Sequence, residues 1–261
     1  PPGSTFKILT AMEYMRENPS FDKYRYECSG SDTFGGNVIR CYNGEHHGTV
    51  DLKSSLAHSC NGSFAHIGVG LNRKSYRKLC EAFGFNSSLG VKFVSSRSRF
   101  VLDEKSDTAE AAQTAIGQGK TTITPLQNAL ISATIANDGV MMTPYLVDHT
   151  ESVDGHVVKK YEPQEKRTAI SRKRANQVTR MMRSVVSDGT AAALRNLSYP
   201  VAGKTGTAEI DSEGTSHAWF VGFAPAADPK IAVSVIVEGA GTGSQYAVPI
   251  AAKMLEEYLG N

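Results

Sequence analysis

Apolar residues recur every three to four positions in several stretches of the chain, the spacing of an amphipathic helix. The first stretch begins near Ser4, directly after Pro and Gly, and continues through Met15. Further helices are expected over residues 51–71, 125–136 and 171–187. The second of these is interrupted by the turn-prone residues 59–62, so polar side chains are expected at a break inside a helical region.

Two of these helices have clear boundaries. Thr124 and Gln127 form a capping box with Pro125 at the first helical position, and this helix is expected to end before Asn137-Asp138-Gly139. Its predicted buried stripe is Leu126, Ala129, Leu130 and Ala133. The helix over 171–187 is predicted to bury Val178, Met181, Met182, Val185 and Val186.

The pattern changes after Gly203, where short segments rich in β-branched and aromatic residues alternate with turns. They predict consecutive antiparallel strands over 204–209, 218–223 and 230–237, followed by a helix over 247–258. A separate hairpin is expected where 146–149 and 157–161 flank Asp154-Gly155. A largely helical first part followed by a meander and a helix indicates an α+β fold with a cleft where the two parts meet.

The amino-acid composition limits the kinds of molecule that the protein can bind. The 261 residues include 28 Lys+Arg and 26 Asp+Glu, a net charge of +2, which argues against a nucleic-acid-binding protein. Hydrophobic residues make up 40% of the chain, enough for a sizeable core. The longest apolar region, 231–237, is far shorter than the roughly 20 residues of a membrane span.

The four cysteines do not form a C-x-x-C pair, so no metal site is expected. Cys28 and Cys41 flank a Gly-rich stretch that can fold back as a hairpin, which leaves a disulfide or two buried thiols as alternatives. Cys60 is interpreted as a buried thiol rather than a nucleophile, because no partner histidine is evident. The histidines at positions 46, 47, 58 and 66 lack a metal-binding spacing and are expected at the surface or at helix caps.

Three short motifs carry the chemical signal. Ser4 and Lys7 are three apart, which places a hydroxyl and an amine on one helix face; this S-x-x-K spacing also occurs at Ser20 and Ser75, so it is not specific alone. Ser59-Cys60-Asn61 is the only S-x-N in the chain, and Lys204-Thr205-Gly206 is the only K-T-G. In this order the three motifs are the known signature of class A β-lactamases and penicillin-binding proteins.

The chain resembles the transpeptidase domain of class B high-molecular-weight penicillin-binding proteins. Besides the three motifs, the similar stretches are 2–7, 117–119, 124–127, 135–139, 189–191, 203–209 and 219–225. The resemblance implies an antiparallel sheet with helices on both faces beside a helical lobe, here mainly within 10–200, with the sheet and last helix in 201–261. Family members have a helix and two strands before the S-x-x-K helix, whereas this chain begins three residues before Ser4 and is expected to lack them.

The resemblance also implies a role for each motif residue. Ser4 would be the nucleophile, Lys7 its base, Ser59 the proton relay and Lys204 the residue that keeps the site positive. Asn61 would bind the substrate amide, Thr205 and Thr207 its carboxylate, and the strand edge at Gly206 its backbone. Backbone N–H groups of Ser4 and Thr207 would form the oxyanion hole, and no metal or organic cofactor would be needed.

The implied activity is a peptidoglycan D,D-transpeptidase that is acylated by D-Ala-D-Ala stem peptides and by β-lactams. A β-lactam sensor and a D,D-carboxypeptidase stay open as alternatives. A class A β-lactamase would need a glutamate in an E-x-x-L-N loop; Glu104 and Glu110 stand in that region without this motif. The expected location is the outer side of the bacterial membrane, with an anchor outside this sequence and cell-wall synthesis proteins as partners.

Overall fold

The computed structural model of the protein describes residues 1–91, 93, 95–211 and 213–260. Its sheet consists of β9 (Ala202–Glu209), β10 (Ser216–Ala224) and β11 (Ile231–Val237), in the order β11-β10-β9 and antiparallel throughout. These are the three predicted strands, each within two residues of its expected bounds. Eight of the nine residues of the central strand β10 are buried, so both faces of the sheet are covered.

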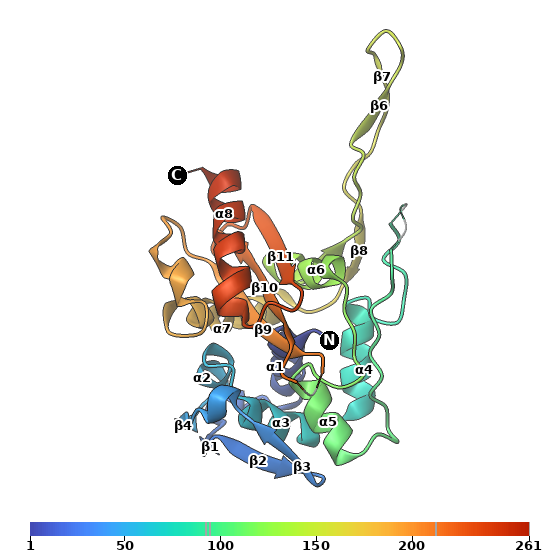
Figure 1. The fold of residues 1–261 in the computed structure, drawn as a ribbon. Helices are drawn as coiled ribbons and strands as arrows, with labels where there is room; N and C mark the ends of the chain where they lie inside the picture. Colours follow the sequence, from blue (N-terminus) through green and yellow to red (C-terminus); the bar gives the residue numbers. More distant parts are fainter. Residues whose placement is uncertain (92, 94, 212, 261) are drawn as a thin grey trace.

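Helices from opposite ends of the chain cover the sheet. The C-terminal helix α8 (Val248–Leu259) packs against β10 and β11, as do residues of α6 (Pro125–Ala136), and α7 (Arg172–Ser187) packs against β9. Figure 1 shows α8 running along the sheet and the other helices gathered on the far side and below. The α+β fold with helices on both faces is thereby confirmed.

The helical lobe below the sheet contains the first two predicted helices. A 3₁₀ turn over Gly3–Phe6 leads directly into α1 (Lys7–Glu17), and the stretch predicted over 51–71 forms α2 (Leu52–Ala57) and α3 (Asn61–Gly70). The break lies at 58–60, overlapping the predicted 59–62, but Asn61 and Gly62 already belong to α3. The lobe also holds α4 (Arg73–Ala82) and α5 (Thr108–Ala115), which the apolar pattern did not reveal.

One predicted buried face is wrong. In α6 the residues expected to be buried are only partly so; those that are buried are Gln127, Asn128, Ile131, Ser132, Thr134 and Ile135. The physical reason is that α6 packs against the sheet and α7 and uses buried polar side chains as partners for other segments. The Gln127 amide donates to the carbonyl of Phe83, and the Asn128 amide donates to Thr5 Oγ1 at 3.3 Å. The buried stripe predicted for α7 is confirmed.

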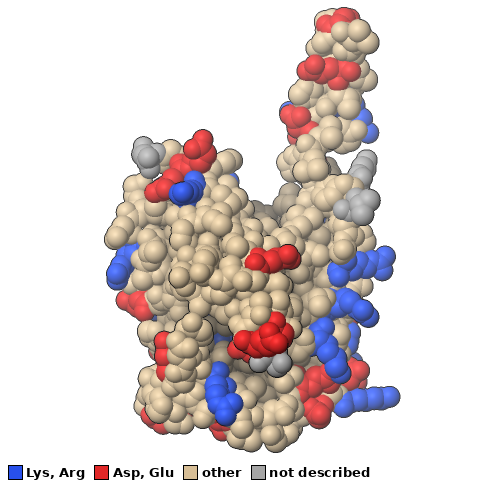
Figure 2. Space-filling view, viewed as in Figure 1, with Lys and Arg blue, Asp and Glu red and all other residues tan. Residues whose placement is uncertain are grey.

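Short strands lie at both ends of the molecule. Near α3 lie β1 (Tyr26–Cys28), β2 (Ser31–Phe34), β3 (Asn37–Arg40) and β4 (Gly48–Val50), in which β1 pairs with β4 and β2 with β3. At the opposite end β5 (Val140–Met142) pairs with β8 (Glu165–Thr168). The predicted hairpin is β6 (His149–Glu151) and β7 (Val157–Lys160), which stands clear of the body in Figures 1 and 2.

The sheet has two open edges. Within the described residues β11 pairs only with β10. The outer edge of β9 faces the helical lobe instead. In the part of the chain that the structure describes, no helix is long and apolar enough to cross a membrane. Figure 2 shows acidic and basic side chains on the same face of the molecule.

Candidate active site

Ser4 lies in the 3₁₀ turn that precedes α1, at the point where this turn touches β9. Gly3 has a φ of +55°, and a Cβ at this position would lie 2.7 Å from the carbonyl oxygen of Thr207. The Gly3 N–H donates to the carbonyl of Gly117 at 2.9 Å. Because glycine tolerates both the left-handed backbone and the close approach, Ser4 can sit directly beside strand β9.

Lys7 is the first residue of α1, and its side chain is completely buried. Its Nζ donates to Ser59 Oγ at 3.1 Å, to the Ser59 carbonyl at 2.7 Å and to Asn61 Oδ1 at 2.6 Å. Ser59 lies in the break between α2 and α3, and Asn61 is the first residue of α3. No described hydrogen bond joins Lys7 to the hydroxyl of Ser4, one helical turn away.

Lys204 approaches the same hydroxyl from the opposite side. Its Nζ donates to Ser59 Oγ at 3.0 Å and to the Thr205 carbonyl at 2.9 Å, and its side chain is also fully buried. Ser59 has a φ of +58°, unusual for a residue other than glycine. This conformation ends α2 and turns the serine toward both lysines. The three motifs, far apart in the sequence, therefore meet at one hydroxyl group.

Burial affects the acidity of both lysines. Loss of water around the Lys7 ammonium lowers its pKa from 10.5 to about 8. Burial, and secondarily the positive charge of Lys7, lowers the pKa of Lys204 well below its usual value. Two ammonium groups that share one hydroxyl favour loss of a proton from one of them, and the pair titrates as a unit. A neutral amine near physiological pH is what a general base requires.

A cleft of about 640 Å³ opens between the helical lobe and the outer edge of β9. The predicted residues that line it are Ser4, Ser59, Asn61, Thr205, Gly206 and Thr207. Because β9 is an edge strand, its free backbone groups face this space and can pair with an extended peptide. Lys7 and Lys204 lie below the cleft floor, so all eight predicted residues come together in one place.

Asn61 connects the cleft to the loop above it. Its Oδ1 accepts from Lys7, while its Nδ2 donates to the carbonyl of Arg40 at 2.7 Å. Residues 40–45 and His47 form one wall of the cleft. No motif or hydrophobic period in the sequence marks this wall as part of the site.

Thr190 is a second contributor that the motifs do not reveal. Its hydroxyl hydrogen-bonds the hydroxyl of Thr205, and its N–H donates to the carbonyl of Ala57 at 3.2 Å. The neighbouring Gly189 packs so closely on α2 that a Cβ there would lie 2.1 Å from the Ala57 oxygen. The only sequence feature that pointed to Thr190 was the similarity of residues 189–191 to the penicillin-binding protein family.

The cysteines near the site are not bridged. Cys28 and Cys41 are free and buried, with their sulfurs 3.7 Å apart, so the alternative of two buried thiols describes the structure. Cys60 is fully buried and absent from the cleft lining, which agrees with its interpretation as a buried thiol. The histidines were expected at the surface or at helix caps, and this is wrong for His47. Only 9% of its side chain is exposed, and it contacts Cys28.

The comparisons with known proteins agree with this geometry. Residues 1–256 match the family described as penicillin binding protein transpeptidase domain. The chain belongs to this family. The transpeptidase domain is 33% identical over 274 residues to the peptidoglycan D,D-transpeptidase PbpA of Mycolicibacterium smegmatis, covering 96% of the chain and 53% of that protein. The family match and this relative place the chain among the class B penicillin-binding proteins.

Solved structures show the same fold. The D,D-transpeptidase domain of a peptidoglycan glycosyltransferase from Eggerthella lenta matches with a TM-score of 0.91 and 29% identity, over 99% of this chain and 66% of that one. The penicillin G acyl-enzyme complex of penicillin-binding protein A from M. tuberculosis matches with a TM-score of 0.90 and 30% identity, over 99% and 61%. Compared with the curated relatives that it matches, the chain spans about half of their length.

Proposed function

We propose that this domain is a peptidoglycan D,D-transpeptidase whose Ser4 forms an ester with stem peptides ending in D-Ala-D-Ala and with β-lactams. The observation that carries the proposal is the meeting of Lys7 and Lys204 at the Ser59 hydroxyl, beside Ser4 in one cleft. The similarity to a penicillin-binding protein crystallised as a penicillin acyl-enzyme supports it. Residues 1–261 would act as one domain, with the cleft between its two parts.

In the first half-reaction Ser4 Oγ attacks the carbonyl carbon of the penultimate D-Ala, and neutral Lys7 takes the hydroxyl proton. The developing oxyanion would accept hydrogen bonds from the N–H groups of Ser4 and Thr207, each worth about 3 kcal/mol in comparable enzymes. When the amide C–N bond breaks, the departing amine takes a proton through Ser59, whose hydroxyl contacts both lysines. The product is the acyl ester of Ser4 and free D-Ala.

In the second half-reaction the amino group of another stem peptide attacks the ester, and Ser4 leaves with its proton restored. With a β-lactam the cleaved C–N bond lies in a ring, so the amine stays tethered and blocks the acceptor. Asn61 would bind the substrate amide, and the edge at Gly206 would pair with its backbone. The Thr205 and Thr207 hydroxyls would hold the terminal carboxylate. No organic cofactor takes part in these steps.

A β-lactamase would need a base that directs water at the ester. Neither Glu104 nor Glu110 lines the cleft, and Glu110 instead lies 3.3 Å from the exposed ammonium of Lys120. The glutamates that do line the cleft, Glu45 and Glu209, stand outside any E-x-x-L-N sequence. Slow deacylation is therefore expected. A peptidoglycan substrate would put the domain on the outer side of the bacterial membrane, with cell-wall synthesis proteins as its partners.

The first test is the intact mass of the purified protein during incubation with penicillin G. We expect a lasting one-to-one adduct on the wild type and none on Ser4→Ala. Ser20→Ala removes the exposed serine of another S-x-x-K sequence and should retain the adduct. An adduct that survives Ser4→Ala and is lost in Cys60→Ala would refute the nucleophile assignment, and rapid drug loss without an adduct would favour a β-lactamase.

A peptide assay distinguishes the remaining alternatives. With a D-Ala-D-Ala peptide and an amine acceptor, a transpeptidase gives the cross-linked product and releases D-Ala. A carboxypeptidase releases D-Ala without forming that product, and a sensor leaves the peptide unchanged although penicillin acylates it.

A further inference from the structure

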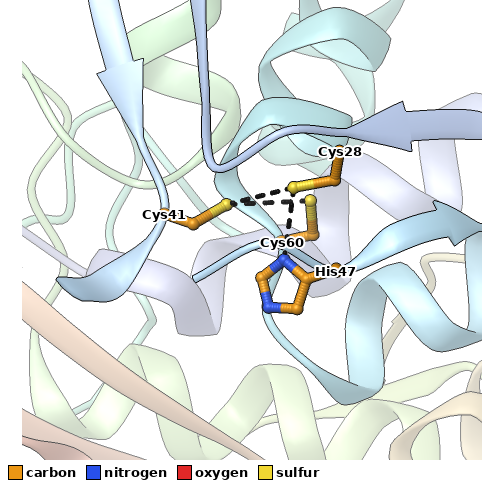
Figure 3. A group of neighbouring side chains, drawn as sticks. All are labelled: Cys28, Cys41, His47 and Cys60. Atoms are coloured by element: carbon orange, nitrogen blue, oxygen red, sulfur yellow. Dashed lines mark hydrogen bonds between the residues drawn. The ribbon is translucent and has the colours of Figure 1, made fainter. Parts of the chain in front are cut away.

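Three cysteines and one histidine converge beside the cleft, from four separate elements. Cys28 ends β1, Cys41 follows β3, His47 precedes β4 and Cys60 caps α3. Figure 3 shows their sulfur and nitrogen atoms pointing at a common centre. We propose that Cys28, Cys41, His47 and Cys60 form a binding site for one zinc ion.

Three of the distances between the ligand atoms are close to those of a tetrahedral site. Zinc at about 2.3 Å from sulfur and about 2.0 Å from nitrogen requires sulfurs about 3.8 Å apart and sulfur and nitrogen about 3.5 Å apart. The observed separations are 3.7 Å for Cys28 to Cys41, 3.8 Å for Cys41 to Cys60 and 3.3 Å for Cys28 to His47 Nδ1. All four ligand atoms lie within 4.8 Å of one another.

Disulfide bonding explains the cluster less well. Three mutually close sulfurs leave one thiol unpaired in any disulfide, and His47 would then have no role. Thiolate and imidazole ligands together are the set that zinc prefers. Four protein ligands also leave no open position for a substrate, so this is a closed, structural type of site.

Groups around the cluster suit ligands of a metal. His47 Nε2, the nitrogen that faces away from the sulfurs, is buried without a hydrogen-bond partner and lies 3.6 Å from the Glu45 carboxylate. A carboxylate behind a ligating histidine is the usual outer contact of zinc sites. The N–H of Ser63 points at the Cys60 sulfur at 3.4 Å, as backbone amides do toward bound thiolates.

The local packing indicates what the ion would do. Cys28, Cys41, Cys60 and Val50 form a small apolar cluster separate from the main core. Among the cleft-wall residues 40–45 and 47, Cys41 alone is buried, and small cores commonly need a metal or disulfide for stability. Because Cys60 lies between Ser59 and Asn61, the ion would fix the wall to the residues that contact Lys7.

The test begins with the metal content of the protein, purified under reducing conditions with zinc and then desalted. We expect about one zinc ion per chain in the wild type and in Cys80→Ser, which alters the fourth buried cysteine outside the cluster. Cys28→Ser and His47→Ala should lose most of it. His47→Cys, which restores four ligands, should retain it. Cobalt(II) added to the zinc-free protein should give the visible bands of a tetrahedral thiolate site.

A metal-free wild type that also fails to bind added zinc or cobalt would overturn the proposal. A mass two hydrogens below that of the reduced chain, which means a disulfide, would do the same, as would equal zinc loss in Cys80→Ser. If Cys28→Ser does not fold, chelation of the wild type followed by readdition of zinc replaces that variant, and reversible uptake of one ion is expected.

The positioning role rests on the proposed function and has its own measurement. Zinc-depleted wild type should react with penicillin more slowly, by about tenfold or more, and readded zinc should restore the rate. An unchanged rate would refute this role. Zinc uptake does not depend on Ser4, so a protein that binds zinc but is never acylated would refute the transpeptidase and leave the metal site intact.

Discussion

At the scale of single residues, the notable feature is one hydroxyl shared by two buried lysines. Lys7 and Lys204 each donate to Ser59 Oγ, and burial lowers the pKa of both. Bringing two ammonium groups to this position is unfavourable unless one becomes neutral. The fold therefore prepares a neutral amine within one helical turn of Ser4, which an exposed S-x-x-K sequence such as Ser20 to Lys23 cannot do.

The first prediction at this scale concerns pH. Lys7 acts as a base only when neutral, and its neutral fraction rises as pH increases through its pKa of about 8. The rate of penicillin acylation should accordingly rise roughly tenfold per pH unit well below this value and level off above it. Stopped-flow kinetics with a fluorescent penicillin would measure it. A rate that falls as pH rises through 8 would contradict the assignment.

The matching substitution is Lys7→Ala, which should slow acylation by about 100-fold or more above pH 8, where Lys7 of the wild type is neutral, and remove the rise near pH 8. Circular dichroism spectra would show whether the variant is folded. Lys23→Ala, in the S-x-x-K sequence at Ser20, is the control and should leave the pH profile unchanged.

At the scale of elements, the ends of three secondary-structure elements converge on the cleft. The 3₁₀ turn before α1, the break between α2 and α3, and the start of β9 each carry one motif. Their close approach depends on small residues: Gly3 lies against Thr207, and a Cβ at Gly206 would be 3.0 Å from side-chain atoms of Thr5 and Trp219. The site is thus an assembly of element ends held by tight backbone packing.

Gly3→Ala tests this packing. Its positive φ alone should destabilise the protein by about 1–2 kcal/mol, and the contact with Thr207 should add about 1–3 kcal/mol. Gly36→Ala is the matched control: this glycine also has a positive φ, but its Cβ would meet no atom within 4 Å. Urea unfolding gives the free energies and penicillin labelling the acylation rate. Equal destabilisation by both changes would mean that the contact is unimportant.

At the scale of the whole molecule, the cleft lies between the sheet edge and the helical lobe. The β6–β7 hairpin stands apart from both parts (Figure 1). Its valines at positions 153, 157 and 158 are exposed, and β6 pairs only with β7 among the described strands. The hairpin therefore contributes little to the core or to the site.

Replacing residues 149–160 with a short Gly-Ser turn should leave the penicillin acylation rate within about twofold and the free energy of unfolding nearly unchanged, because surface changes away from the core have small effects. Labelling kinetics and urea unfolding measure both. A large loss of acylation would show that the hairpin supports the cleft after all.

Local sequence determined much of this protein. The period of apolar residues predicted α1, α2, α3, α6 and α7, because a helix buries every third or fourth side chain whatever it packs on. Three motifs in order contain seven of the eight predicted residues that meet at the cleft, and the family resemblance supplied the eighth, Thr207. The buried stripe of α6 was beyond this reasoning, because Gln127 and Asn128 are buried only through partners supplied by distant segments.

Only the tertiary structure determined the features that depend on residues from distant parts of the sequence lying close together. Cys28, Cys41, His47 and Cys60 are spread over 33 residues without a metal-binding spacing, and only the turns between β1 and α3 bring their ligand atoms together. Thr190 likewise gains its place from the packing of Gly189 on α2. The lowered pKa of Lys7 also arises from the fold, since burial depends on neighbours that arrive from 50 or more residues away.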